Sequence, residues 1–163
     1  MKIGVLSDTH LKFPDSRLDH ILQELFRAYD MILHAGDIVS GAVLERLEEK
    51  GVLAVCGNMD DYEVAATLPQ KRIIPVGGKR IGLIHGWGSR QGLRERLLER
   101  LKPDNPDIVV YGHSHVAFWG EVNGAMMFNP GAAAHNPYGD TGTVGRIEIV
   151  DGNVETAFLP VKN

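Results

Sequence analysis

Short apolar runs alternate with amphipathic stretches over the first third of this 163-residue chain. Residues 3–6 form a buried-strand pattern, and apolar side chains then recur at the 3.6-residue period of a helix that begins near residues 15–16. A strand at 31–33, a short helix stopped near Gly51 and a strand at 52–55 follow. This β-α-β-α-β order predicts parallel strands joined by right-handed crossovers.

The rest of the chain is richer in strands. Ser89 is expected to cap a helix that ends before Pro103, and a buried strand at 108–111 follows it. Turns that contain Gly-Gly, Asn-Gly and Asp-Gly separate the other predicted strands, which is typical of hairpins. These strands lie at 72–76, 80–84, 117–122, 125–128, 144–150 and 154–159.

Composition narrows the class of protein. With 44% apolar and 23% charged residues and no linker, the chain is expected to form one globular domain over residues 1–163. The net charge of −4 provides no basic stripe, so we do not expect a nucleic-acid partner. No apolar run approaches the ~20 residues of a membrane span. The single cysteine, Cys56, and the lack of a leader pattern make the cytoplasm the default compartment.

Residues with metal-ligand chemistry follow five of the predicted strands. Together they supply two carboxylates, one amide and four imidazoles, enough for two divalent cations, and this mixture suits Mn, Fe, Zn or Ni better than calcium. A lone Gly-Asp is usually a turn, but ligands bind outside the carboxyl ends of strands in open α/β sheets, where all five features fall. They are Asp8-Thr9-His10, Gly36-Asp37, Gly57-Asn58, His85-Gly86 and Gly112-His113-Ser114-His115.

This ordered set, with Asn129-Pro130-Gly131 after a late strand, resembles the calcineurin-like metallophosphoesterase superfamily, and in particular its small bacterial and archaeal phosphodiesterases. The resemblance implies an α/β fold: a four-layer αββα sandwich of two mixed sheets flanked by helices. It also implies two divalent ions, with Mn²⁺ the leading candidate and Ni²⁺, Fe²⁺ or Zn²⁺ the alternatives. One ion would be held by Asp8, His10, Asp37 and His115, and the other by Asp37, Asn58, His85 and His113.

The function that the resemblance implies is a phosphodiesterase for small substrates, nucleotides among them, with a metal-activated hydroxide as the nucleophile. Its catalytic residues would be Asp37, Asn58 and His113. A phosphomonoesterase on the same site is the first alternative. A non-catalytic scaffold such as the retromer subunit of this fold is the second, although the complete ligand set counts against it. The expected partner is a small phosphate ester, and self-association is left open.

The sequence departs from the family pattern at Met59, where relatives usually carry a histidine taken as the general acid. A thioether donates no proton, so what replaces that acid stays open. Asp60 could act as an acid, orient a ligand or serve as a turn residue. Trp87 could stack on a base or aryl group, or anchor its loop.

Three residues are predicted to contact substrate. Asn58 would do so beside the second ion, Arg90 follows closely on the His85 motif, and His135 lies in the long loop after residue 129. His34, in the strand before Asp37, is expected to pack behind the ligands rather than to bind metal.

Overall fold

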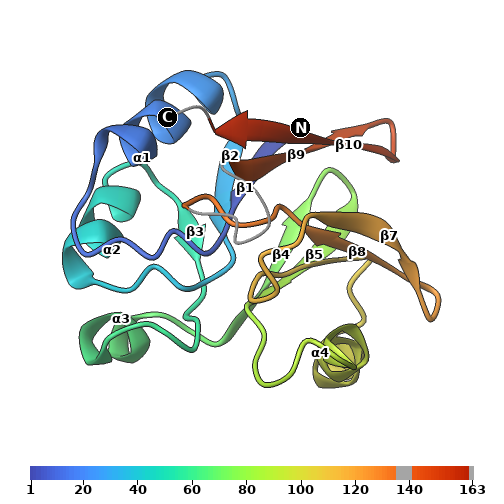
Figure 1. The fold of residues 1–163 in the computed structure, drawn as a ribbon. Coiled ribbons are helices and arrows are strands. Elements are labelled where there is room, and N and C mark those ends of the chain that lie inside the picture. The colour runs from blue at the N-terminus through green and yellow to red at the C-terminus, as the bar shows by residue number, and fades with distance from the viewer. Residues whose placement is uncertain (135–140, 162–163) are drawn as a thin grey trace.

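The computed structural model describes residues 1–134 and 141–161, within which the strands form two five-stranded sheets (Figure 1). In spatial order the first sheet comprises β10 (Asn153–Val161), β9 (Gly142–Val150), β1 (Lys2–Leu6), β2 (Met31–His34) and β3 (Leu53–Ala54). The second comprises β4 (Lys71–Val76), β5 (Lys79–Ile84), β6 (Ile108–Val110), β8 (Ala125–Asn129) and β7 (Phe118–Val122). Both sheets are mixed, because β1, β2 and β3 are parallel, as are β5, β6 and β8, whereas the other neighbours pair antiparallel.

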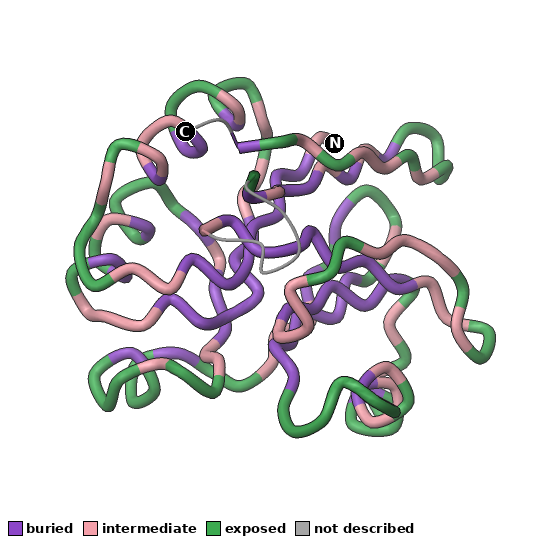
Figure 2. The backbone as a smooth tube through the Cα atoms, in the orientation of Figure 1, coloured by how far each residue is buried: buried purple, intermediate pink, exposed green. Residues whose placement is uncertain are grey.

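Three apolar clusters separate four layers, which confirms the predicted αββα sandwich. The first sheet packs on one face against α1 (Ser16–His20), the π-helical turn η1 (Ile21–Leu25), α2 (Gly41–Glu48) and α3 (Tyr62–Thr67). Its other face packs against the second sheet, whose far face is covered by α4 (Leu93–Leu101). A short 3₁₀ turn, η2 (Lys102–Asp104), follows α4. Buried segments gather where the two sheets meet (Figure 2).

The alternation of side chains along β1 shows how the sequence sets this layering. Ile3 and Val5 point into the core between the sheets, whereas Leu6 points toward the helices. Gly4 also faces the helices, and a Cβ at Gly4 would lie 2.7 Å from the ring of Phe26. The strand therefore uses glycine where the aromatic ring of the first helical segment packs directly on the backbone.

The three predicted hairpins are present, with bounds within a few residues of those expected. Two helical predictions need correction. The helix expected from Ser89 begins at Leu93, because Gly92 occupies its N-cap position with a left-handed backbone, and Ser89 instead accepts a hydrogen bond from the amide of Gln91. The short helix α3 was not predicted, because it buries only Val64 and so shows no apolar period.

The capping residues explain where the first helices start. The side chain of Asp15 accepts a hydrogen bond from the amide of Leu18, and that of Ser40 does the same at the start of α2. Asp19 of α1 forms an ion pair with Arg46 of α2. In the part of the chain that the structure describes, no helix is long and apolar enough to cross a membrane.

Candidate metal centre

The seven predicted ligand side chains meet at one edge of the sandwich. Asp8 and His10 follow β1, Asp37 follows β2, and Asn58 comes after the short β3. From the second sheet, His85 follows β5 directly, whereas His113 and His115 follow β6. Because the parallel strands of both sheets end at this edge, residues up to 107 positions apart converge there.

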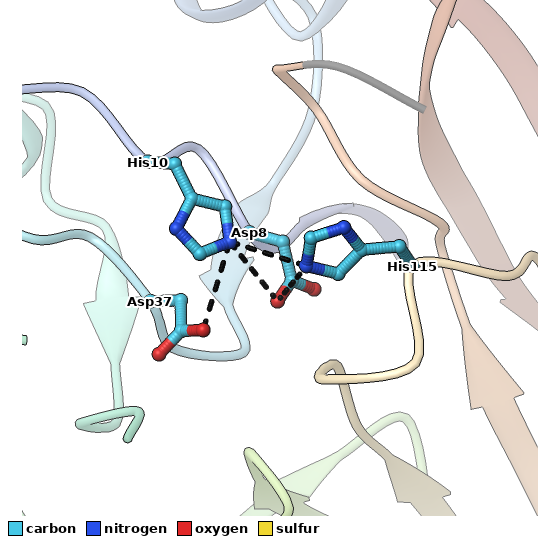
Figure 3. Close-up of side chains that lie close together, drawn as sticks. All are labelled: Asp8, His10, Asp37 and His115. Carbon is cyan, nitrogen blue, oxygen red and sulfur yellow. Dashed lines mark hydrogen bonds and ion pairs between the residues drawn. The ribbon is translucent and has the colours of Figure 1, made fainter. Parts of the chain in front are cut away.

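Four of these side chains form a compact cluster (Figure 3). Asp8, His10, Asp37 and His115 each offer one nitrogen or oxygen atom, and the four atoms lie within 4.8 Å of one another. Asp8 Oδ1 is 3.2 Å from His115 Nε2 and 3.8 Å from His10 Nε2. Asp37 Oδ2 lies 3.6 Å from His10 Nε2. The two carboxylates are buried, and the two imidazoles are partly exposed to solvent.

The other predicted ligands lie on the opposite side of Asp37. His85 Nε2 is 3.2 Å from Asp37 Oδ2 and also 3.2 Å from Asn58 Oδ1. His113 Nδ1 lies 2.8 Å from the same Asn58 oxygen. One oxygen of Asp37 therefore adjoins both groups of donors.

For His85 and His113, backbone carbonyls fix which ring nitrogen faces the centre. His85 Nδ1 is 2.7 Å from the carbonyl oxygen of Ala35, and His113 Nε2 is 2.8 Å from that of Gly88. In its neutral form each ring donates its hydrogen to that carbonyl, so its other nitrogen presents a lone pair to the centre. Histidines that bind metals are oriented in the same way.

The facing atoms fit a cation. His113 Nδ1 and Asn58 Oδ1 would both be acceptors, and His10 Nε2 and His115 Nε2 lie only 3.1 Å apart. Acceptors so close together need a proton or a cation between them. Two donors each about 2.1 Å from one ion lie about 3 to 3.5 Å apart. The residues present therefore match the coordination needs of a divalent metal.

Five of the residues at this edge adopt a left-handed backbone that side chains other than glycine rarely take. Such conformations each cost about 1 to 3 kcal/mol and persist where the surrounding structure enforces them, most often at functional sites. Their φ angles lie between 48° and 70°, for Asp8, His10, Asp37, His113 and His115. Because five strained residues converge at this edge, we infer that it is a functional site.

Hydrogen bonds from one side chain and one backbone amide hold the two carboxylates. The hydroxyl of Ser7 donates to Asp8 Oδ2 at 2.6 Å, and the amide of Met59 donates to Asp37 Oδ1 at 2.8 Å. These bonds occupy the outer oxygen of each carboxylate. The other oxygen, Oδ1 of Asp8 and Oδ2 of Asp37, is the one that faces the histidines.

His34 packs behind the cluster, as predicted from the sequence. Its Nδ1 accepts a hydrogen bond from the amide of Gly36, so Nε2 carries the hydrogen that it shares with the hydroxyl of Thr9 at 3.1 Å. Burial lowers the pKa of His34 to about 3, which keeps the ring neutral. A neutral ring in this place adds no positive charge that would repel a bound cation.

The charge state of Asp37 also suits a cation. Burial acts to raise the pKa of this carboxyl, but the hydrogen bond and charge of His85 and the amide of Met59 outweigh burial and lower it. The pKa of His85 is raised: burial opposes its charged form, but Asp37 and Asp8 favour it more strongly. The carboxylate is therefore ionised and surrounded by nitrogen donors, as metal coordination requires.

Two further polar residues, Asp60 and Asn129, arrange the ligand loops. The carboxylate of Asp60 accepts from the amides of Val39 and Gly57, and so connects the loops that carry Asp37 and Asn58. The buried amide of Asn129 donates to the carbonyl of Gly112 and the hydroxyl of Ser114, which holds the His113–His115 loop. The Asn-Pro-Gly sequence was the signal for this second role.

The other residues that the sequence singled out differ in position. Met59 is 59% exposed, so its side chain stands at the entrance while its amide serves Asp37. Arg90 lines a separate pocket with Tyr111 and Ser114. His135 falls outside the described residues. Trp87 is 42% exposed and lines a cavity of about 350 Å³ that also reaches Asn58 and His85.

Fold and site together define an α/β sandwich protein with a metal-binding centre of aspartate and histidine. The model of the calcineurin-like phosphoesterase superfamily domain matches residues 1–152, and the chain belongs to that superfamily. It is a metal-dependent phosphoesterase, as predicted.

Named relatives agree with this assignment. A probable metallophosphoesterase of Methanothermobacter thermautotrophicus is 37% identical over 137 residues, which cover 81% of this chain and 77% of the relative. A phosphodiesterase of Methanocaldococcus jannaschii is 29% identical over 147 residues, covering 80% and 83%. Among solved structures, wild-type Vps29 from Entamoeba histolytica complexed with zinc is similar with a TM-score of 0.69 at 25% identity, covering 99% of this chain and all of the other.

Proposed function

We propose that this protein is a phosphodiesterase that acts on small phosphate esters with two divalent cations. The observation that carries the proposal is the position of Asp37 Oδ2, which lies 3.6 Å from His10 Nε2 and 3.2 Å from His85 Nε2. A carboxylate oxygen that lies close to two groups of potential metal ligands is suited to bridge two cations, which otherwise repel each other. Asp8, His10 and His115 would complete the first set, and Asn58, His85 and His113 the second.

Bound cations would supply an activated water as nucleophile and would neutralise charge on the phosphate oxygens. The chain's own residues hold the metal-ligand side chains in position. Ser7, Met59 and the carbonyls of Ala35 and Gly88 orient the donors. Asn58 also lines the open cavity and can donate through its amide nitrogen to a substrate oxygen. We propose Mn²⁺ as the native metal because mixed imidazole and carboxylate ligation suits it, and Ni²⁺, Fe²⁺ and Zn²⁺ are the alternatives.

A relative named as a phosphodiesterase supports the diester reading, and a phosphomonoesterase on the same site is the second candidate. The test is to strip the protein with chelator and to compare hydrolysis of an aryl phosphodiester and its monoester with and without added Mn²⁺. We expect cleavage that depends on metal and favours the diester. Preference for the monoester would establish the second candidate. No cleavage with any of the four metals would favour the scaffold role.

Arg96 is expected to support the second set of donors through its loop. Its guanidinium donates to the carbonyls of Trp87, Ser89 and Gln91, and so fixes the loop whose Gly88 carbonyl orients His113. Replacing Arg96 with glutamine should therefore weaken the second ion by about tenfold and leave the first unchanged. Chelator-competition titration with Mn²⁺ measures both affinities. Equal weakening of both ions, or of neither, contradicts this role.

Met59→His should raise turnover selectively for diesters with poor leaving groups. The side chain stands exposed at the rim, and imidazole can donate a proton where a thioether cannot. General acid catalysis is typically worth about 10²- to 10⁴-fold, and its value grows as the leaving group becomes more basic. Measuring kcat across a series of aryl and alkyl esters tests this. Equal or lower rates along the whole series would refute it.

A further inference from the structure

The cavity beside the metal centre, here called the Trp87 pocket, has walls that point to a particular kind of ligand. Its volume of about 350 Å³ lies within the ~300–1,000 Å³ range of small-molecule sites. Its lining includes two of the proposed metal ligands, Asn58 and His85, and two basic residues, Lys71 and Arg100. The other lining residues are Cys56, Gly57, Gln70, Ile84, Gly86 and Trp87.

The charge of this pocket is opposite to that of the protein. The chain carries a net charge of −4, yet none of the described residues that line the pocket is a carboxylate. Lys71 forms an ion pair with Asp104, which does not line the pocket. Arg100 is exposed, and within the described residues its guanidinium has no hydrogen-bond or ion-pair partner. The pocket therefore presents one unpaired guanidinium fork, which suits a phosphate or carboxylate.

Trp87 supplies the second recognition element. Its carbonyl oxygen is held by Arg96 at 2.8 Å, so its loop is fixed although its side chain is 42% exposed. The chain's other tryptophan, Trp119, packs instead against Phe128 in the core. A large aromatic side chain that stays half exposed on a fixed loop beside a cavity is placed to stack on a planar ring.

We propose that the Trp87 pocket binds one arm of the diester substrate, and that this arm carries an aromatic or heteroaromatic ring followed by a second anionic group. The ring stacks on Trp87, and the distal anion pairs with Arg100 beside Lys71, as a nucleotide arm with an additional phosphate would do. This inference rests on the proposed phosphodiesterase function. It goes further in naming the structure of the substrate arm and the residues that select it.

Three p-nitrophenyl phosphodiesters separate the contribution of the ring from that of the distal anion. The first has a methyl arm, the second a thymidine arm, and the third a thymidine arm with an additional 3′-phosphate. With the Mn²⁺-loaded wild-type protein, we expect kcat/KM to rise along this series. Arg100→Gln should lower kcat/KM about tenfold for the third ester only, because only that ester has the distal anion. Trp87→Ala should lower it about tenfold for both thymidine esters.

Arg27→Gln is the matched control, because Arg27 is exposed and does not line the pocket. It should leave all three values unchanged. If neither Arg100→Gln nor Trp87→Ala changes the ratio between the thymidine esters and the methyl ester, the inference is wrong. The methyl ester tests the proposed function separately, since the wild-type protein and Arg27→Gln should both cleave it when metal is present.

Binding provides a second readout that does not depend on turnover. In a Trp119→Phe background, Trp87 is the only tryptophan, so its fluorescence reports on the pocket. Titration with thymidine 3′,5′-bisphosphate should quench this signal, and Arg100→Gln should raise the apparent Kd about tenfold. Methyl phosphate should produce no quenching. An Arg100→Gln titration identical to that of the parent would overturn the assignment of the anion to Arg100.

Discussion

Asp37→Asn should lower phosphodiesterase activity by about a thousandfold or more and release at least one metal ion. The neutral amide keeps an oxygen that can accept from the Met59 amide, so the loop is expected to stay folded. It cannot supply the negative charge that a pair of cations requires at the position between His10 and His85. Metal content after dialysis and kcat/KM for an aryl diester measure the two effects together.

Two variants make this result specific. Asp151→Asn changes a carboxylate in the exposed β9–β10 turn, where asparagine tolerates the left-handed backbone, and should retain activity and metal. His115→Ala removes a donor from one set only, so it should weaken one ion much more than the other. An Asp37→Asn protein that keeps wild-type activity refutes the bridging role.

Gly57→Ala is expected to have the second-largest effect, on stability and on metal binding together. A Cβ at Gly57 would overlap both Oδ1 and the amide nitrogen of Asp37. Backbone cannot move aside as the end of a flexible side chain can, so the loops that carry Asp37 and Asn58 must separate. Forced overpacking of this kind typically costs about 1 to 3 kcal/mol. Thermal unfolding and Mn²⁺ titration check the prediction.

Gly120→Ala is the matched control for this substitution. Gly120 lies in β7, and the nearest atom to an added Cβ is the ring tip of Phe118 at 3.1 Å, which can shift slightly. Gly120 does not have a positive φ, so alanine can adopt its backbone conformation. Alanine also lowers the entropy of the unfolded chain, which offsets the small shift of the ring, so the free energy of unfolding should stay close to the wild-type value. Wild-type stability and metal content in Gly57→Ala would show that the two loops are not in the close contact described above.

The local sequence pattern was sufficient to predict the positions of most strands and helices. Short apolar runs placed the strands, and Asn-Gly and Asp-Gly placed two hairpins, because these turns depend on only two residues. The start of α4 was predicted three residues too early, with Ser89 in place of Gly92 as the N-cap. Gly86, Gly88 and Gly92 all adopt left-handed backbones there and turn the chain into a loop that Arg96 fastens from within the helix. A single capping serine could not reveal that arrangement.

The basic residues Arg94 and Arg96 of α4 make specific contacts that the sequence of the helix does not indicate. Arg94 donates to the hydroxyl of Tyr111 at 2.8 Å and lies 3.5 Å above the ring of Phe118. Arg96 binds three carbonyls of the preceding loop. Charge patterning along one helix does not indicate which carbonyls or rings other segments bring to it.

The sequence by itself predicted which polar side chains gather at one edge of the sandwich, because each follows a strand and the carboxyl ends of parallel strands meet there. Only the tertiary structure decided how those donors divide. It placed Asp37 Oδ2 between His10 and His85, oriented two imidazoles through the carbonyls of Ala35 and Gly88, and opened a cationic pocket beside them. The contacts that position Asp37 and the two imidazoles join residues from 25 to 50 positions apart, and such contacts leave no local pattern in the chain.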